Sequence, residues 1–146
     1  MDTFVHSNFQ ALGLSEAILQ DLAAAGFSSP TPIQEQAIPP ALAGRDVIGC
    51  AQTGTGKTAA FVIPMVERLA ALPKGQPQAL ILAPTRELAL QTLTTIEKLG
   101  RSRRISATVI VGGADMQAQV RGLRQRPEIL VATPGRLLDH MWSGNI

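Results

Sequence analysis

Residues 51–58 have the composition and spacing of a loop that binds nucleotide phosphates. The segment reads Ala51-Gln52-Thr53-Gly54-Thr55-Gly56-Lys57-Thr58. Gly54 and Gly56 permit backbone angles that a side chain disfavours, so successive amide N–H groups can point at phosphate oxygens. Lys57 would supply positive charge to the outer phosphates, and the Thr58 hydroxyl would bind Mg2+. The pattern therefore predicts a site for a nucleotide and Mg2+.

The first position of this loop departs from the general phosphate-loop pattern, because Ala51 stands where that pattern has glycine. The alternative interpretation is a tight strand-to-helix turn with a surface lysine. A short apolar run at 47–50 predicts a buried strand before the loop, with Cys50 as a core thiol, and residues 57–72 predict a helix after it. This strand–loop–helix order favours the phosphate loop.

Three further segments, each directly after a predicted strand, are suited to binding anions. They are Pro84-Thr85-Arg86, Gly112-Gly113 and Thr133-Pro134-Gly135-Arg136. Taken singly, each is better interpreted as an ordinary helix cap or turn. In open parallel sheets, however, ligands bind beyond the carboxyl ends of the strands. Three such segments beside the phosphate loop exceed what one nucleotide needs, so we expect a second, extended polyanion.

Aromatic side chains indicate how such a polyanion would be bound. The chain has four Phe, one Trp and no Tyr, and none of them falls in these three segments. Base stacking is therefore not expected to be the main contact. Contacts to phosphate and sugar, which do not depend on base sequence, are expected instead.

The order of predicted elements indicates an α/β fold. Ser15 caps a first helix that closes at Gly26, and Thr31 caps a second that ends at Gly44, with Pro39-Pro40 expected to interrupt or kink it. Beyond residue 45, strands and helices alternate. Strands are predicted at 47–50, 79–83, 105–111 and 129–131, and helices at 57–72, 86–99, 116–123 and 135–141. Apolar strands joined by helices predict a parallel sheet with helices on both faces.

Length and composition set limits on the class of protein. With 146 residues, 45% of them hydrophobic and 16% charged, the chain is expected to form one globular domain. A net charge of +2 is too small to identify a nucleic-acid binder by itself. One Cys excludes an internal disulfide, no apolar run approaches a membrane span, and Met1 to His6 show no signal-peptide pattern. We expect a cytoplasmic protein that does not contact a membrane.

Taken together, these motifs resemble the N-terminal RecA-like domain of DEAD-box RNA helicases. Phe9, followed by residues 26–34 with Phe27 and Gln34, is similar to the adenine-recognising Q motif of that family. The resemblance implies that Gln34 offers a donor and an acceptor to the adenine edge and that Phe9 stacks on its ring. Without this resemblance, we would interpret Gln34 as a surface glutamine and Phe9 as a core residue. In this family alanine is the usual first residue of the loop, which accounts for Ala51.

The resemblance implies an ATP-dependent RNA helicase, with RNA-stimulated ATP hydrolysis and local unwinding of RNA duplexes. Its cofactors would be ATP and Mg2+. Residues 84–91, 112–113 and 133–139 resemble the family's RNA-backbone motifs. Residues 1–44 would be a helical Q-motif region, and residues 45–146 part of a RecA-like ATP-binding domain.

The sequence also lacks parts that the resemblance implies. The Asp-Glu-Ala-Asp box, expected on a strand after 135–141, is not reached by Ile146. The Ser-Ala-Thr motif and the C-terminal RecA-like domain with its arginine finger are missing too. We therefore expect a truncated domain that is inactive alone, needs that second domain as a partner, and exposes an unpaired apolar sheet edge prone to self-association.

Two other functional hypotheses remain open from the sequence. The first is a different phosphate-loop enzyme, such as a DNA helicase or a transport ATPase, which would show no preference for adenine. The second is a non-catalytic module that binds RNA or a partner protein without turnover. Nucleotide preference distinguishes the first hypothesis from the helicase. The second is distinguished by whether the encoded chain continues past Ile146 into an Asp-Glu-Ala-Asp strand.

Overall fold

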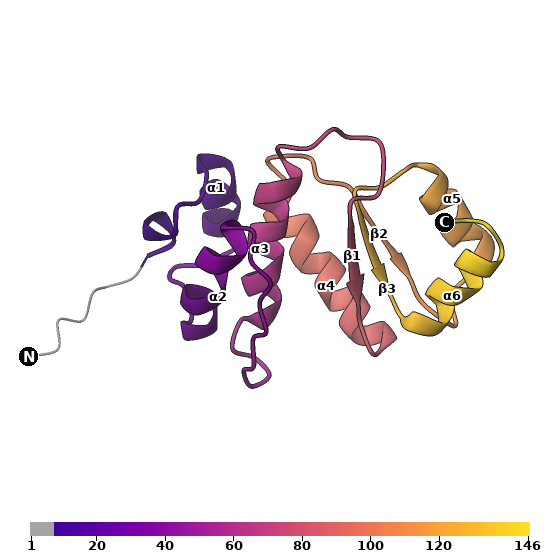
Figure 1. Cartoon of the computed structure of the whole chain (residues 1–146), viewed down its shortest axis with the longest axis horizontal. Coiled ribbons are helices and arrows are strands. Elements are labelled where there is room, and N and C mark those ends of the chain that lie inside the picture. Colours follow the sequence, from indigo (N-terminus) through magenta and orange to yellow (C-terminus); the bar gives the residue numbers. More distant parts are fainter. Residues whose placement is uncertain (1–7) are drawn as a thin grey trace, which may run out of the picture.

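A computed structural model gives the arrangement of residues 8–146 (Figure 1). The segment on which the signal-peptide expectation rests, Met1 to His6, lies outside the described residues. The structure has a short 3-10 helix η1 (Phe9–Leu12), six α-helices and three β-strands along this range. Within it, no helix is long and apolar enough to cross a membrane.

The strands β1 (Ala79–Leu82), β2 (Ala107–Ile110) and β3 (Ile129–Ala132) form a parallel sheet in the order β1-β3-β2. The central strand β3 is buried along its whole length. Leu82 of β1 and Ile110 of β2 both lie opposite Ala132 of β3. The three strands therefore end at the same level of the sheet.

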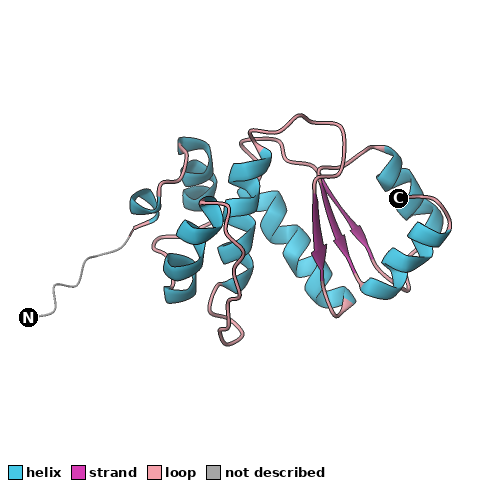
Figure 2. Cartoon of the chain, in the orientation of Figure 1, coloured by secondary structure: helices cyan, strands magenta, loops and turns pink. Residues whose placement is uncertain are grey.

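Helices cover both faces of this sheet (Figure 2). Helix α4 (Arg86–Leu99) lies on one face, and α5 (Met116–Arg124) and α6 (Pro134–Trp142) lie on the other. Side chains of β3 alternate between the two: Ile129 and Val131 join the core beneath α4, whereas Leu130 and Ala132 join a second cluster with Leu123 and Leu137. The predicted α/β class is confirmed, and the double burial explains why β3 is apolar at every position.

The remaining helices form a layer outside α4 (Figure 1). Helix α3 (Lys57–Leu69) packs against α4, and α2 (Pro32–Leu42) and α1 (Glu16–Ala24) pack against α3. Ile38, Val62 and Ile96, one from each of α2, α3 and α4, are fully buried. One hydrophobic core therefore joins the N-terminal helices to the sheet.

The buried carboxylate of Asp21 and the half-buried carboxylate of Glu67 hold α1 in place. Asp21 is 4% exposed, and its carboxylate accepts hydrogen bonds from the backbone N–H of Ser102 at 3.0 Å and from the Ser102 hydroxyl at 2.6 Å. Glu67 of α3 accepts a hydrogen bond from the Ser15 hydroxyl at 2.5 Å and pairs with Arg103 at 3.5 Å. These contacts join α1 to α3 and to the connector that precedes β2.

The strand predicted at 47–50 is absent from the structure, and this prediction was wrong. The segment is irregular and exposed: Ile48 is 96% exposed and Val47 is 43% exposed. Cys50, expected in the core, is also exposed. A strand needs a neighbour to satisfy its backbone hydrogen bonds, and no strand among residues 8–146 lies alongside 47–50.

Helix α2 continues through Pro39 and Pro40, against the prediction of an interruption. Both prolines fall in its last turn, so the missing N–H groups remove hydrogen bonds only close to the end of the helix. The other predicted helices are confirmed, although α3 ends at Leu69 and not at residue 72.

Candidate functional site

The phosphate loop, residues 51–58, leads directly into α3. Gly54 and Gly56 adopt left-handed backbone angles with φ of 82° and 85°, which a residue with a side chain adopts at a cost. The N–H groups of residues 53–58 have no hydrogen-bond partner in the described part of the chain. Free N–H groups at a helix N-terminus bind anions, so the loop fits a nucleotide's phosphates.

The two side chains predicted to act on phosphates and metal lie at the first turn of α3. Lys57 is exposed and Thr58 is half-buried. Among the described residues, no group of three or more His, Cys, Asp or Glu side chains is arranged to hold a metal ion.

Gln34 lies behind the phosphate loop and is bonded at both ends of its side-chain amide. It is 1% exposed. Its Oε1 accepts a hydrogen bond from the backbone N–H of Thr31 at 3.0 Å, and its Nε2 donates to the backbone carbonyl of Gly56 at 3.1 Å. A Cβ atom on Gly56 would overlap Gln34 Nε2. The loop therefore packs directly on the side chain that the family resemblance assigns to adenine.

The aromatic residues predicted to contact adenine lie elsewhere. Phe9 is 5% exposed in the hydrophobic core, and Phe27 is half-buried beside it. Both line a small cavity of about 170 Å³, of which Gln34 is not a lining residue. The structure thus brings Phe9 and Phe27 together but keeps Gln34 apart from their cavity. A role for these three residues in binding adenine stays a prediction.

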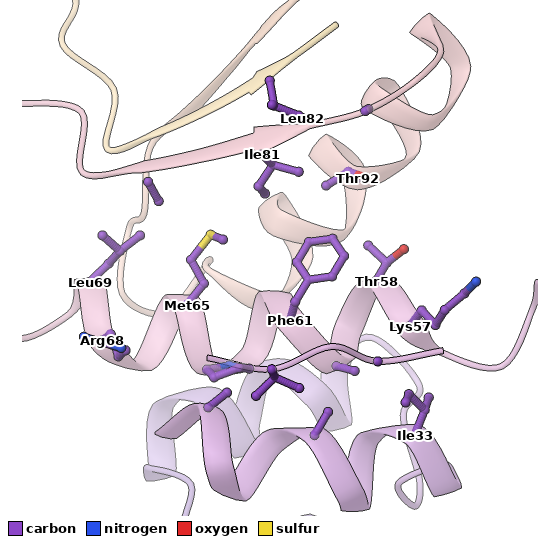
Figure 3. A pocket seen from close by; sticks show the side chains of 18 of the residues that line it. Ile33, Lys57, Thr58, Phe61, Met65, Arg68, Leu69, Ile81, Leu82 and Thr92 are labelled. Atoms are coloured by element: carbon purple, nitrogen blue, oxygen red, sulfur yellow. The ribbon is translucent and has the colours of Figure 1, made fainter. Parts of the chain in front are cut away.

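A groove of about 740 Å³ runs between α3 and the free edge of β1 (Figure 3). Lys57 and Thr58 lie at one end of it, and Phe61 and Met65 point from α3 toward Ile81 of β1. The irregular segment with Val47 forms part of its lining.

The carboxyl ends of the three strands bring the other predicted segments together. The N–H of Ala83, after β1, donates to the carbonyl of Ala132 at 2.9 Å, and the N–H of Thr133, after β3, donates to the carbonyl of Ile110 at 2.9 Å. The segments that start at Pro84, Gly112 and Thr133 therefore leave the sheet side by side. The predicted gathering at one end of the sheet is confirmed for these three. It was wrong for the phosphate loop, because no strand among residues 8–146 leads into that loop.

Gly112 and Gly113 form an exposed turn after β2, called the glycine turn below. Gly113 has φ of 76°. Neither residue's N–H has a hydrogen-bond partner among residues 8–146. A Cβ atom on Gly113 would lie 3.4 Å from Nη1 of Arg86, so the guanidinium group at the start of α4 stands beside the turn. Two free N–H groups and one cation suit a phosphate.

The two threonines at helix starts behave differently. The hydroxyl of Thr85 accepts a hydrogen bond from the N–H of Leu88 at 3.2 Å, which is the action of an ordinary N-cap. Thr133 makes no such bond at the start of α6. The N–H groups of Gly135 and Arg136 also have no partner in the described chain. The start of α6 therefore keeps donors free for a ligand.

Arg136, which the sequence predicts to contact RNA, has a side chain that is 15% exposed. Its Nη1 donates to the carbonyl of Ala114 at 3.0 Å and to Oε1 of Gln119 at 3.2 Å. Its Nε lies 3.6 Å from the Asp139 carboxylate. Direct contact between this side chain and RNA stays a prediction.

Sequence reasoning missed Gln119 and His140, which are 7% and 0% exposed. The Nε2 of His140 lies 2.9 Å from Oε1 of Gln119. Burial, and then the positive charge of Arg136, lower the pKa of His140, while Asp139 acts in the opposite direction. The sequence could have pointed to these two residues only as polar residues on the buried face of a helix. Which face of each helix is buried is known only from the fold.

Comparison with known proteins connects this site to one group of enzymes. The family model described as DEAD/DEAH box helicase matches residues 31–146. The chain is 50% identical over 133 residues to the ATP-dependent RNA helicase CshA of Limosilactobacillus reuteri, which covers 91% of this chain and 27% of the relative.

Two fungal proteins show the same relation. The chain is 55% identical over 135 residues to the ATP-dependent rRNA helicase RRP3 of Pyricularia oryzae, covering 92% of this chain and 25% of the relative. It is 48% identical over 143 residues to the ATP-dependent RNA helicase drs1 of Schizosaccharomyces pombe, covering 97% of this chain and 19% of the relative. The chain thus spans about a quarter or less of the length of these relatives.

Proposed function

Because the chain belongs to the DEAD/DEAH box helicase family, we propose that it is the ATP-binding part of an ATP-dependent RNA helicase. The observation that carries this proposal is the phosphate loop, whose N–H groups at residues 53–58 are free at the start of α3. Lys57 adds a charge that attracts the outer phosphates. The names of the relatives, all ATP-dependent RNA or rRNA helicases, support the same activity.

Thr58 is proposed to hold Mg2+ together with the nucleotide's phosphates. Bound Mg2+ supplies charge that neutralises the phosphate oxygens. The protein's own contribution is the fixed position of Thr58, one residue inside a helix whose next two residues, Ala59 and Ala60, are buried.

Gln34 is proposed to recognise adenine, as the family resemblance implies. Beyond these bonds to Thr31 and Gly56, the Gln34 amide keeps one N–H donor and one acceptor lone pair. The side chain is 1% exposed, so adenine recognition requires neighbouring groups to move and expose it. The bond to Gly56 lies on the phosphate loop itself. Binding of the base would therefore be coupled to the conformation of the loop.

RNA is proposed to bind at the carboxyl ends of β1, β2 and β3, through its sugar-phosphate backbone. The free N–H groups of the glycine turn, the free donors at the start of α6 and the Arg86 cation support this. None of the three segments contains an aromatic residue on which a base could stack. Binding is therefore expected to be independent of base sequence.

Hydrolysis and unwinding are proposed to need more than the described residues provide. Phosphoryl transfer relies on groups that position water and stabilise charge, and the described residues offer Lys57 and Thr58 at the loop. A second RecA-like domain is the proposed partner. By itself, the 146-residue chain is expected to bind ATP without hydrolysing it.

The experiment that tests this function is a titration of the chain with a fluorescent ATP analogue in the presence of Mg2+. Lys57→Ala is expected to weaken binding by about tenfold or more, because charge-assisted hydrogen bonds contribute about 1.5–3 kcal/mol. Lys98→Ala, which removes an exposed lysine from the last turn of α4, is the matched control. Equal affinity of the Lys57→Ala variant and the wild type would refute the assignment, and equal affinity for a GTP analogue would favour a different phosphate-loop enzyme.

A further inference from the structure

A cluster of three side chains holds the glycine turn from both of its ends. Gln119 of α5 donates from Nε2 to the carbonyl of Val111, the residue before the turn, at 2.8 Å. Arg136 of α6 donates from Nη1 to the carbonyl of Ala114, the residue after it, at 3.0 Å. The turn is thus fixed at its entry by one helix and at its exit by another.

The two side chains that hold the glycine turn also contact each other, through one oxygen atom of Gln119. Oε1 of Gln119 accepts a hydrogen bond from Arg136 at 3.2 Å and lies 2.9 Å from Nε2 of His140. Because the Gln119 amide must present its NH2 group to the Val111 carbonyl, the atom that faces Arg136 and His140 is the oxygen. His140 Nε2 must then carry the hydrogen.

The remaining nitrogen of His140 completes the arrangement. Nδ1 lies 3.1 Å from Nδ2 of Asn145, which can donate to it. The neutral tautomer with hydrogen on Nε2 therefore satisfies both ring nitrogens at once. Gln119 and His140 are buried, and hydrogen bonds at both the nitrogen and the oxygen of the Gln119 amide hold it in one orientation. This gives the cluster the rigidity that positioning requires.

We propose that Gln119, with Arg136 and His140 behind it, is a positioning residue that fixes the glycine turn for contact with an RNA backbone. This inference rests on the proposed RNA-binding function. It assigns Arg136 an indirect role: its guanidinium group is engaged by Ala114 and Gln119, so it acts through the turn. The atoms that meet the phosphate are the free N–H groups of Gly112 and Gly113.

The rigidity of the turn matters because glycine is the most flexible residue in a chain. An unrestrained pair of glycines would lose conformational freedom on binding RNA, and that loss opposes binding. A turn already held by two carbonyl tethers loses less. Removing the tethers is therefore expected to weaken RNA binding without removing any group that touches RNA.

The test uses three variants of the whole chain. Gln119→Ala removes both the tether to Val111 and the acceptor for Arg136. Gln119→Glu keeps the size of the side chain and the acceptor but cannot donate to Val111, so it isolates the first tether and is informative if the alanine variant unfolds. Gln117→Ala is the matched control, because Gln117 is an exposed glutamine on the same helix.

Two measurements are made on each variant. The NMR order parameters of the Gly112 and Gly113 amides report the rigidity of the turn without any ligand. In wild type and in Gln117→Ala we expect values of about 0.85, falling below about 0.6 in Gln119→Ala. Titration with single-stranded oligouridylate gives RNA affinity, which we expect to fall by about tenfold in Gln119→Ala. Affinity for the ATP analogue is expected to stay at the wild-type value.

The outcomes separate this proposal from the function on which it rests. Unchanged order parameters in both Gln119 variants would overturn it, since the turn would then be rigid without Gln119. Lower order parameters with unchanged RNA affinity would also overturn it, while leaving RNA binding established. Wild-type chain that binds ATP but no oligouridylate would refute the RNA function, and the proposed role of Gln119 with it.

Discussion

The side-chain amide of Gln34 donates a hydrogen bond to the backbone carbonyl of Gly56 at 3.1 Å, joining α2 to the phosphate loop. The residues are 22 positions apart in the sequence. The same amide accepts a hydrogen bond from Thr31 at the start of α2. Gln34 is therefore a structural support of the loop in this structure, whatever further role it has toward adenine.

Gln34→Ala is expected to lower the free energy of unfolding by about 1–3 kcal/mol, because it leaves two backbone groups without their partners. Urea denaturation would measure the change. Gln36→Ala removes an exposed glutamine from the same helix and should have little effect. Equal midpoints for the two variants would contradict a supporting role for Gln34.

Gly56→Ala and Gly54→Ala form a matched pair. Both glycines are left-handed, so each substitution is expected to cost about 1–2 kcal/mol in backbone strain. At Gly54 the new methyl group would meet open space, whereas at Gly56 it would collide with Gln34. Gly56→Ala should therefore unfold at lower urea concentration than Gly54→Ala. The opposite order would show that Gln34 moves aside at no cost.

His140 is expected to make stability depend on pH. Its pKa in the folded chain is lowered by burial and by Arg136, with Asp139 opposing, whereas in the unfolded chain it is about 6.5. From α5, the uncharged amide of Gln119 contacts its Nε2. Between the two pKa values the unfolded state binds more protons, so the free energy of unfolding rises with pH up to about 6.5 and levels off above it.

Replacing the imidazole ring of His140 tests whether its lowered pKa causes this pH dependence. Urea denaturation of wild type and His140→Gln across pH values from about 5 to about 7.5 gives the free energy of unfolding at each pH. Carboxylates titrate in both proteins, so the difference between the two curves isolates His140. This difference should shrink as the pH falls below about 6.5. Parallel curves would show that His140 has the same pKa in both states.

Arg86→Ala is expected to weaken binding of single-stranded RNA and to lower the slope of log affinity against log salt concentration by about 0.7, the value for one phosphate contact. Affinity for the ATP analogue should not change. Arg124→Ala, in the last turn of α5, is the control, because it lies at the opposite end of that helix from the glycine turn. An unchanged salt slope in Arg86→Ala would exclude the proposed phosphate contact.

We expect the chain to self-associate through the open edge of β1. Along β1, alternate N–H groups point to β3, as the bond from Ala83 to Ala132 shows; the N–H groups of Leu80 and Leu82 therefore face the open side. Leu80 and Leu82 are 50% and 57% exposed. An unpaired apolar edge of this kind pairs readily with another chain.

Leu82→Lys places a charge at this edge and should weaken self-association by about tenfold, measured by sedimentation equilibrium over a range of concentrations. Leu138→Lys is the control, because Leu138 is 43% exposed but lies on α6, away from β1. A monomeric wild type, or the same association in both variants, would contradict pairing through β1.

Features that depend on neighbouring residues were predictable from the sequence. The bounds of α4 agree with the prediction at both ends, because Thr85 caps its start and Gly100 follows its end. The order of strands and helices after residue 57 was also predictable, since short apolar runs between polar connectors mark buried parallel strands. The phosphate loop follows from its glycines and from the helix after it.

Features that depend on distant partners were not predictable. The apolar run at 47–50 has the composition of a strand, but a strand forms only where another lies beside it, and here Ile48 is 96% exposed. The direction of a side chain is decided in the same way. No signal in the sequence indicated that the guanidinium group of Arg136 donates to the Ala114 carbonyl and the Gln119 amide, both from other elements.

The sequence by itself thus determined which segments can bind phosphates, because the free N–H groups of a glycine-rich loop or a helix start are local properties of the backbone. Only the tertiary structure decided which of these segments lie together and what holds them. Parallel pairing in register placed Pro84, Gly112 and Thr133 side by side. Hydrogen bonds between separate elements, from Gln34 and from Gln119, then fixed the phosphate loop and the glycine turn, at positions that sequence spacing does not encode.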